Sequence, residues 1–310
     1  MMPPYYESRF LRANHPDRAQ AVWLRSTLLL PAPGDPVADV WVLLFDLGGG
    51  GHRAVNPPCP LAPAQCPSDP WSGRIAETTI DDVSARGSVP GATWDLRITP
   101  GEEPAVKLLT DRAYRARFPT AKTQVRHPLA RFDGTVAVGE TRVELTGWLG
   151  SVNHNWGRRH TPAYAFGQVC GFDGEPQSSL EIVTAHAAIG PLRLPAATLF
   201  VLRHGGREFA VRSVSAARHT HGSYEPFSWS FDGTTDGVQM RGEISAEPRD
   251  VIGLTYTDTN GAAKYCYNSA LATCRITLAG NGVDTELTAT RRAMFEILCS
   301  DPIAAVPLLA

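Results

Sequence analysis

The sequence predicts an all-β protein built from antiparallel strands. Three observations favour this fold class: 28 glycines and 25 prolines occur in 310 residues, apolar and polar residues alternate over short segments in both halves, and Gly-rich turns join many of these segments. Glycine and proline punctuate turns, and a period of two is typical of half-buried strands. No rhythm of strand, helix and strand is visible, which argues against a parallel α/β sheet.

The first half of the chain contains two predicted hairpins. Residues 21–30 and 39–45 are strand-like and flank a turn rich in proline and glycine. Residues 135–145 alternate around Gly139, which begins a two-residue turn of the kind that joins hairpin strands. Residues 92–98 also alternate and predict a further strand.

The second half repeats this style with three predicted hairpins. Their strand pairs are residues 199–203 with 207–211, 227–231 with 238–244, and 274–278 with 283–288. Helices are expected only in short pieces, at residues 75–85 and 291–299. Many short strands joined by Gly-rich turns favour barrels or sandwiches, and a barrel of about eight strands can hold one small ligand.

Composition and charge exclude several classes of protein. The chain has 29 Lys and Arg against 31 Asp and Glu, so it lacks the basic excess that nucleic-acid binding requires. No run of about 18 apolar residues predicts a transmembrane helix, and the first residues do not resemble a signal peptide. A cytoplasmic protein is therefore expected, in which the six cysteines are free thiols. Residues 56–70 hold six prolines and predict a loop.

The segment 153–160 is the most informative part of the sequence. It contains two His, two Arg, two Asn and a Trp within eight residues. On a strand, His154 and Trp156 share one face, and a His beside an aromatic wall is suited to protonating an alkene and tolerating the resulting cation. The alternative is a structural plug, in which Asn and Arg bond loop carbonyls while Trp156 packs. The residues alone leave both interpretations open.

Other candidates carry the same ambiguity. Glu181 lies in an apolar run, where burial would raise its pKa and make it a proton donor. Alternatively, it could pair with Arg158 or Arg159. His186 is either a core residue or a cavity-lining one. Lys264 and Asn268 follow a turn, where they would bond strand ends or rim a cavity.

Three groups of residues resemble a known superfamily. They are residues 5–16 (YYESRFLRANHP), residues 153–159 (NHNWGRR) with 164–168 (YAFGQ), and residues 253–256 (GLTY) with 264–269 (KYCYNS). Together they span nearly the whole chain, and the His-x-Trp-Gly element is the most diagnostic. They are similar to segments of the tocopherol cyclase, carotenoid 1,2-hydratase and AttH-like superfamily, in particular to an uncharacterised bacterial branch of it.

This resemblance implies a fold of two consecutive lipocalin-like antiparallel β-barrels, which we place at residues 1–157 and 158–310. It also implies hydration, cyclisation or isomerisation of an apolar isoprenoid or polyene, with no metal or organic cofactor. In the hydratase branch a His and a Trp of the His-x-Trp element are implicated in activity, and they fall on His154 and Trp156. That branch also uses a Tyr and an Asp somewhat downstream, but no Tyr-x-Asp element occurs at the corresponding distance here, where Glu181 is the nearest carboxylate in a strand-like setting.

We therefore expect an enzyme whose apolar cavity folds and protonates its substrate. The expected catalytic residues are His154, Trp156, Glu181 and Tyr164. The expected substrate-binding residues are Asn153, Phe166, Gln168, His186, Trp229, Tyr256, Lys264 and Asn268. The alternative is a non-catalytic binder or carrier of an apolar small molecule. If the enzyme hypothesis is correct, His154→Ala should abolish turnover without loss of folding.

Overall fold

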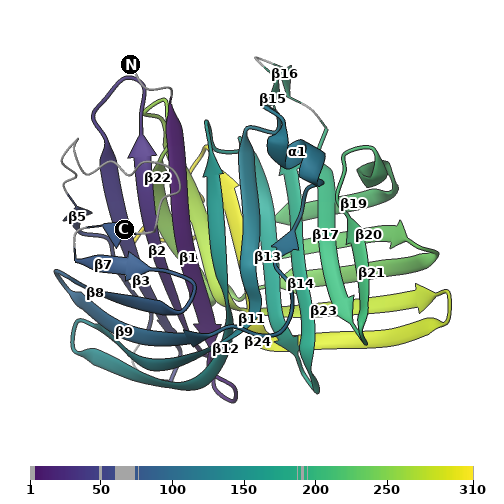
Figure 1. Cartoon of the computed structure of the whole chain (residues 1–310), viewed down its shortest axis with the longest axis horizontal. Coiled ribbons are helices and arrows are strands. Elements are labelled where there is room, and N and C mark those ends of the chain that lie inside the picture. The colour runs from purple at the N-terminus through teal and green to yellow at the C-terminus, as the bar shows by residue number, and fades with distance from the viewer. Residues whose placement is uncertain are drawn as a thin grey trace.

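The computed structural model describes residues 4–48, 51–59, 74–75, 77–186, 188–189, 192–193 and 195–309. Most of the described chain forms two curled antiparallel sheets that lie side by side (Figure 1). The all-β prediction is confirmed. Most of the proline-rich segment 56–70 lies outside the described residues.

The first sheet contains the strands from Tyr5 to Gly157. In chain order these are β1 (Tyr5–Asn14), β2 (Gln20–Leu30), β3 (Val37–Asp46), β4 (Arg53–Val55), β5 (Pro58–Cys59), β6 (Arg74–Ile75), β7 (Thr78–Ile80), β8 (Ser84–Val89), β9 (Ala92–Thr99), β10 (Val106–Lys107), β11 (Ala121–Val138) and β12 (Thr141–Gly157). A short helix, α1 (Asp111–Arg115), lies between β10 and β11.

The second sheet contains the strands from Ala163 to Cys299. They are β13 (Ala163–Phe172), β14 (Glu175–His186), β17 (Ala197–His204), β18 (Arg207–Val211), β19 (Thr220–Glu225), β20 (Ser228–Thr235), β21 (Val238–Ser245), β22 (Ile252–Thr257), β23 (Ala263–Gly280) and β24 (Val283–Cys299). Two 3₁₀ turns, η2 (Ala216–His219) and η3 (Pro248–Asp250), and a small hairpin of β15 (Ala188–Ile189) and β16 (Leu192–Arg193) complete the described elements.

The two sheets have matching strand orders. The first runs β4-β3-β2-β1-β12-β11-β9-β8-β7, with β6 at its end, and the second runs β18-β17-β14-β13-β24-β23-β21-β20-β19. In each half, the first strand along the chain pairs with the last long strand: β1 with β12 and β13 with β24. Each half of the chain therefore forms its own sheet. The structure thus contains an internal repeat that the sequence did not reveal. The division into two domains at residue 157 remains a prediction.

The predicted hairpins are confirmed, including β11–β12, where Gly139 turns with φ of 58°. The two predicted helices are wrong, because residues 75–85 form parts of β6, β7 and β8, and residues 291–299 belong to β24. Residues 293–298 are buried on both faces of β24. A strand buried on both faces reads as a continuous apolar run, which periodicity cannot tell from a buried helix.

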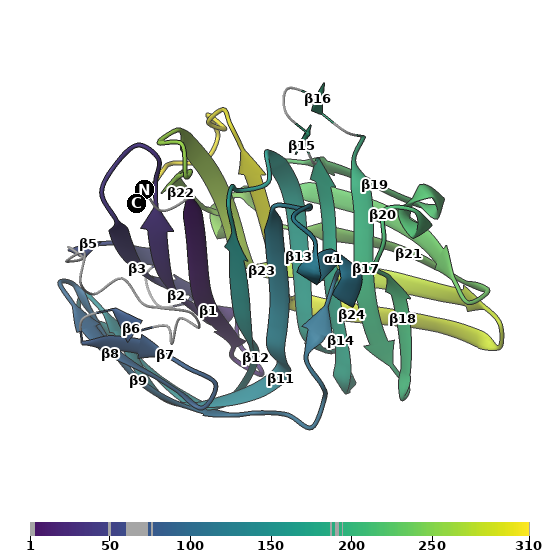
Figure 2. The same ribbon diagram turned by 45° about the horizontal axis from the view of Figure 1, so that its top comes forward.

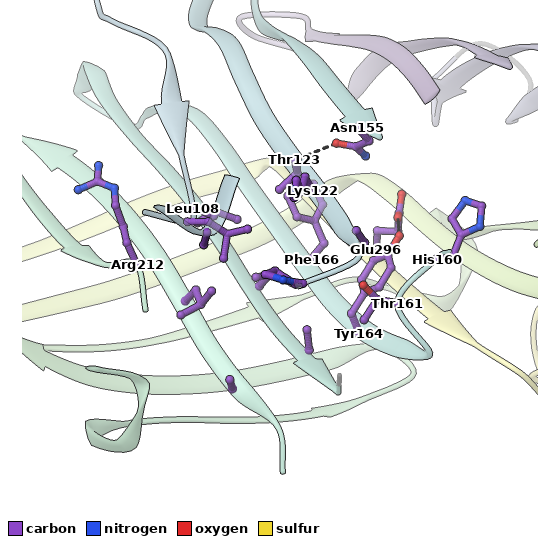
Figure 3. Close-up of a pocket in the computed structure, with 18 of the residues that line it drawn as sticks. Leu108, Lys122, Thr123, Asn155, His160, Thr161, Tyr164, Phe166, Arg212 and Glu296 are labelled. Atoms are coloured by element: carbon purple, nitrogen blue, oxygen red, sulfur yellow. Dashed lines mark hydrogen bonds between the residues drawn. The ribbon is translucent and has the colours of Figure 1, made fainter. Parts of the chain in front are cut away.

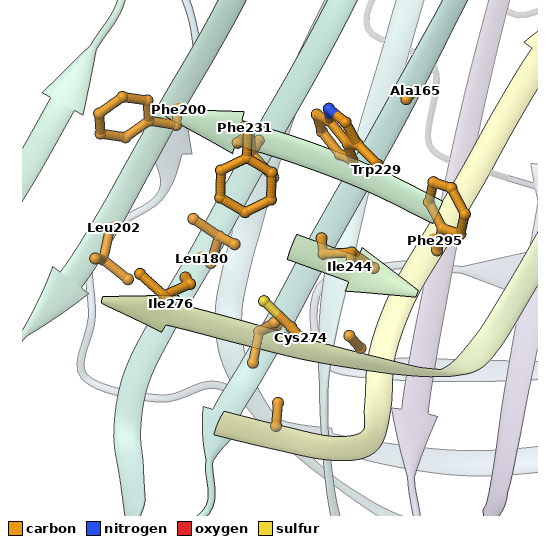
Figure 4. Packing of buried hydrophobic residues seen from close by; sticks show 14 of the residues in the cluster. Ala165, Leu180, Phe200, Leu202, Trp229, Phe231, Ile244, Cys274, Ile276 and Phe295 are labelled. Atoms are coloured by element: carbon orange, nitrogen blue, oxygen red, sulfur yellow. The ribbon is translucent and has the colours of Figure 1, made fainter. Parts of the chain in front are cut away.

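Three apolar clusters hold the fold together. One fills the second sheet, where Trp229 packs against Phe231 and Phe295 (Figure 4). Another fills the first sheet around Trp94 and Trp148. The third joins the sheets, and it includes Trp23, Trp41, Tyr256, Met294 and Leu298. In Figure 2 this junction lies between β1–β3 and β22–β24. The described residues contain no helix long and apolar enough to cross a membrane.

Candidate functional site

A cavity with a volume of about 370 Å³ lies between the two sheets of the described structure. Its walls are mostly apolar and come from both halves of the chain. Aromatic lining is supplied by Tyr6, Phe10, Trp23, Phe118, Tyr164, Phe166 and Tyr256. Aliphatic lining is supplied by Leu108, Leu109, Val183, Ala185, Ala197, Leu199 and Val214.

A segment of the first half, residues 108–123, covers this cavity, and we call it the strap. It includes α1, which lies against β13, β14 and β17 of the second sheet in both views (Figures 1 and 2). The helix is capped by the Thr110 hydroxyl, which accepts from the Ala113 N–H. Arg212 of the second half donates to the carbonyl of Lys107, 2.8 Å away, and so fixes the start of the strap.

Polar groups gather at one side of the cavity, opposite Arg212 and Leu108 (Figure 3). The Tyr164 hydroxyl on β13 donates to Oε1 of Glu296 on β24. Behind them, Asn268 donates to Oε2 of Glu296 at 3.1 Å. Burial, reinforced by the Glu296 carboxylate, raises the pKa of Tyr164 well above its usual value, so this hydroxyl keeps its proton at neutral pH.

Arg25 of β2 also lines this cavity. Its guanidinium lies over the ring of Tyr256, 4.6 Å from the centroid, and its Nε donates to the Thr27 hydroxyl at 3.0 Å. Burial acts to lower the pKa of Arg25, but nearby oxygens, with Tyr256 and Glu296 first, outweigh it and raise that pKa. Arg25 therefore remains a buried cation.

A buried histidine–aspartate pair adjoins the same polar groups. Nδ1 of His160 lies 3.0 Å from Oδ1 of Asp258, and the imidazole stacks on the ring of Tyr6 with centroids 3.9 Å apart. Burial lowers the pKa of His160, although Asp258 opposes this. Burial acts to raise the pKa of Asp258, but hydrogen bonds from His160 outweigh it and lower that pKa to about 2. A neutral His160 thus donates Nδ1–H to an ionised Asp258.

This arrangement leaves the second ring nitrogen of His160 as an acceptor. Among the described residues, Nε2 of His160 has no hydrogen-bond partner. An aspartate that fixes the tautomer of a neutral imidazole is the usual way to present a base. We call Arg25, His160, Tyr164 and Glu296, with Asp258 behind His160, the cavity cluster.

Three of the residues expected from sequence line this cavity, namely Tyr164, Phe166 and Tyr256. Asn268 lies behind them and contacts Glu296. The remaining expected residues lie outside the cavity lining.

His154 and Trp156 lie on the face of β12 opposite to Asn155, which lines the cavity. Nε2 of His154 is 2.6 Å from Oε1 of Glu7, and its ring stacks on Trp156 with centroids 4.6 Å apart. Trp156 in turn stacks on Tyr114 of the strap at 5.8 Å. The His-x-Trp element therefore contacts Glu7 and the strap, and it does not line the cavity.

Glu181, Gln168 and Asn153 belong to a second buried set, which we call the junction network. It joins the two sheets through Arg12, Asn14, Ser151, Asn153, Gln168, Cys170 and Glu181. Arg12 donates to Oε1 of Gln168 at 2.7 Å, and Gln168 donates to Oε2 of Glu181 at 2.8 Å. Burial raises the pKa of Glu181 to about 8 although Gln168 and Arg12 oppose this shift. The adjacent hole has only about 10 Å³.

The other expected residues have separate surroundings. Trp229 lies in the core of the second sheet and is fully buried. Lys264 donates to the Pro162 carbonyl and to the Ser300 hydroxyl, both at 3.0 Å. His186 packs edge-on against Tyr224, with centroids 6.5 Å apart. Their predicted roles in substrate binding remain untested.

Sequence reasoning missed Arg25, His160, Asp258 and Glu296. Glu296 had a readable signal, because it is a carboxylate inside the apolar run Met294 to Leu298, which is the pattern that singled out Glu181. His160 ends the informative segment 153–160. Asp258 also had a readable signal, because it ends the sequence Tyr256-Thr257-Asp258, a Tyr-x-Asp element that stands far downstream of His154. Arg25 gave no local signal, since only the packing of the two sheets brings it to the cavity. Within the described ranges, no cluster of three or more His, Cys, Asp or Glu could hold a metal.

No family model matches this chain. It is 28% identical over 270 residues to the uncharacterized protein Rv0493c of Mycobacterium tuberculosis (strain ATCC 25618 / H37Rv), and equally so to MT0513 of strain CDC 1551. In both cases the match covers 84% of this chain and 77% of the relative.

Solved structures share the fold. An AttH-like protein (NE1406) of Nitrosomonas europaea matches with a TM-score of 0.55 and 11% identity, over 96% of this chain and 92% of the other. Kievitone hydratase of Nectria haematococca matches with a TM-score of 0.55 and 7% identity, over 96% and 89%. The predicted fold of two lipocalin-like barrels, each a curled half-barrel sheet here, is confirmed, and so at the level of fold is the expected resemblance.

Proposed function

We propose that this protein is an enzyme of the hydratase, cyclase or isomerase kind, which moves protons at a carbon–carbon double bond of an apolar isoprenoid or polyene. One observation carries the proposal: an apolar cavity of about 370 Å³ has buried proton-transfer groups gathered at one side. Small-molecule sites commonly have ~300–1,000 Å³ of volume with a few convergent polar groups.

The chemistry needs only side chains. A proton is added to one carbon of the double bond, and an oxygen, from water or from a substrate hydroxyl, bonds to the other carbon and loses its proton. His160 would accept the proton from the oxygen through Nε2, held in the correct tautomer by Asp258. Tyr164 and Glu296 form the second proton-transfer pair and would supply the proton that is added to carbon; the proton taken up by His160 balances this loss.

The shared fold supports this reaction class. Kievitone hydratase has the same two-sheet architecture, although 7% identity supports the fold alone. We therefore infer activity from the cavity cluster, because function follows the geometry of the site.

We assign His154 and Trp156 a positioning role within this proposal. Their stack ends on Tyr114, whose hydroxyl donates to the carbonyl of Thr123. The Thr123 hydroxyl then donates to Asn155 at 2.6 Å, and both residues line the cavity. The His-x-Trp element would thus hold the strap over the substrate and exclude water.

The test is to incubate the protein in D₂O with farnesene, farnesol, farnesal and farnesoic acid. We expect at least one of these isoprenoids to bind and to gain deuterium at carbon, as measured by mass spectrometry. Ala185→Trp, which fills the cavity, should abolish both binding and deuterium incorporation. Ala137→Trp, at a half-buried alanine outside the cavity, is the matched control and should retain both.

Two results would contradict the proposal. Binding without deuterium incorporation by the wild-type protein would indicate a carrier rather than an enzyme. Unchanged binding by Ala185→Trp would place the ligand elsewhere in the molecule.

A further inference from the structure

Arg25 is a buried cation with unused hydrogen-bond donors. Its side chain is only 7% exposed, and it lines the cavity between the sheets. One donor, Nε, is engaged by Thr27. Among the residues that the structure describes, neither terminal guanidinium nitrogen has an acceptor, and no carboxylate forms an ion pair with Arg25.

A buried cation without hydrogen-bond acceptors lowers the stability of the folded protein. Buried charges are normally paired and hydrogen-bonded, because their hydration is lost on folding. The nearest acidic groups do not fill this role. Glu296 acts on Arg25 through its charge, but no hydrogen bond or ion pair of the described residues joins them, and the oxygens of Glu296 accept from Tyr164 and Asn268 instead. Asp39 interacts with Arg25 only at longer range, and burial raises the pKa of that carboxyl.

We propose that Arg25 binds a neutral carbonyl oxygen of the substrate, so that the ligand is an isoprenoid with a carbonyl head group rather than a plain hydrocarbon. This inference rests on the proposed function for the location of the substrate site. A carbonyl oxygen accepts two hydrogen bonds from the planar guanidinium. A ligand carboxylate would also fit that fork, but it would bring a second negative charge close to Glu296.

The fixed charge of Arg25 also selects the chemistry at this end of the cavity. A buried guanidinium stabilises negative charge that develops on an oxygen. It opposes positive charge on a neighbouring carbon by the same Coulombic interaction. A double bond conjugated with the bound carbonyl is therefore the one that this site activates.

The experiment compares three C15 probes that differ at the head group: farnesal, farnesene and farnesoic acid. Their affinities are measured by quenching of tryptophan fluorescence, since Trp23 lines the cavity. We expect wild-type protein to bind farnesal about 10- to 100-fold more tightly than farnesene, as for a hydrogen bond to a charged group. Farnesoic acid should bind more weakly than farnesal.

Two variants assign this preference to Arg25. Arg25→Met should lower the preference for farnesal over farnesene to below about threefold. Arg203→Met removes a similarly buried arginine that lies outside the cavity lining, and it should keep the full preference. In the wild-type complex, the infrared carbonyl stretch of farnesal should shift to lower frequency, which requires no variant to fold.

The outcomes separate this inference from the proposed function. Equal binding of farnesal and farnesene or an unshifted carbonyl stretch would overturn the role of Arg25, and tighter binding of farnesoic acid would overturn the neutral carbonyl as its ligand. Each result would leave the cavity as the substrate site. Failure of all three probes to bind would overturn the substrate site itself.

Discussion

The junction network and the cavity cluster are both buried between the two sheets, and each contains an arginine and a glutamate. They differ in how completely the hydrogen-bond donors of their arginines are engaged. Arg12 uses its guanidinium on Asn14, Gln168, Cys170 and the carbonyl of Arg292. Arg25 has a single hydrogen-bond partner among the described residues, and it faces a cavity of about 370 Å³ instead of a hole of about 10 Å³.

We propose that this difference separates a structural cluster from a functional one. A buried polar network with matched donors rigidifies the structure that surrounds it. A buried donor left over beside a cavity is available to a ligand. Burial of a carboxylate or an arginine is therefore not enough to identify a site, because both clusters share it.

The largest expected effect is a lower free energy of unfolding when the junction network is broken. Arg12→Met leaves several buried acceptors without a donor and should lower the free energy of unfolding by about 3 kcal/mol. Arg25→Met should change it by less than about 1 kcal/mol, because it removes a charge with few partners. Urea denaturation of both variants measures this contrast. Equal losses would mean that the two clusters do not differ in the way described.

A smaller effect concerns the pH dependence of stability. Burial raises the pKa of Glu181 from 4.5 to about 8, so the folded protein binds a proton that the unfolded chain has released between these values. The free energy of unfolding should therefore fall by roughly 1 kcal/mol per pH unit as the pH rises from 4.5 to 8, from this group alone.

Glu181→Gln should remove that slope while keeping the hydrogen bond from Gln168. The measurement is the difference between wild-type and variant unfolding free energies across this pH window. A difference that is independent of pH would show that Glu181 is not protonated in the folded state near neutral pH.

The smallest effect is expected at the His-x-Trp element. His154 lies outside the cavity lining and stacks on Trp156, so His154→Ala should slow deuterium incorporation only about 2- to 10-fold, in line with the loss of one aromatic contact. The rate is compared with that of wild type after circular dichroism has verified folding. A loss of 100-fold or more would instead support the direct catalytic role expected from the sequence.

The sequence predicted most of the fold for a physical reason. Strands with one exposed face, such as β9 and β20, alternate in polarity and are flanked by turns, and this pattern is local. The end of β24 was misread because Ala293 to Leu298 are buried on both faces, one against each core cluster. The face of β24 that carries Met294 and Leu298 is buried by packing between the sheets, and no local sequence pattern encodes that packing.

The site was only partly predictable for the same reason. Tyr164, Phe166 and Tyr256 were expected and line the cavity. Glu181 was chosen over Glu296 although both lie in apolar runs, because sequence cannot show that Glu181 bonds to Gln168 of the junction network while Glu296 lines the cavity. The cavity cluster combines β2, β13, β24 and the segments that follow β12 and β22, so it exists only once both sheets have formed and packed.

The two buried glutamates allow the most direct test of the central claim, that the cavity cluster is the active site and the junction network is structural. The measurement is the rate of deuterium incorporation at carbon into an isoprenoid that the wild-type protein turns over, at pH 7. We expect Glu296→Gln to lower this rate about 100-fold or more, and Glu181→Gln to leave it within about twofold. The reverse result, with Glu181→Gln inactive and Glu296→Gln active, would contradict the claim.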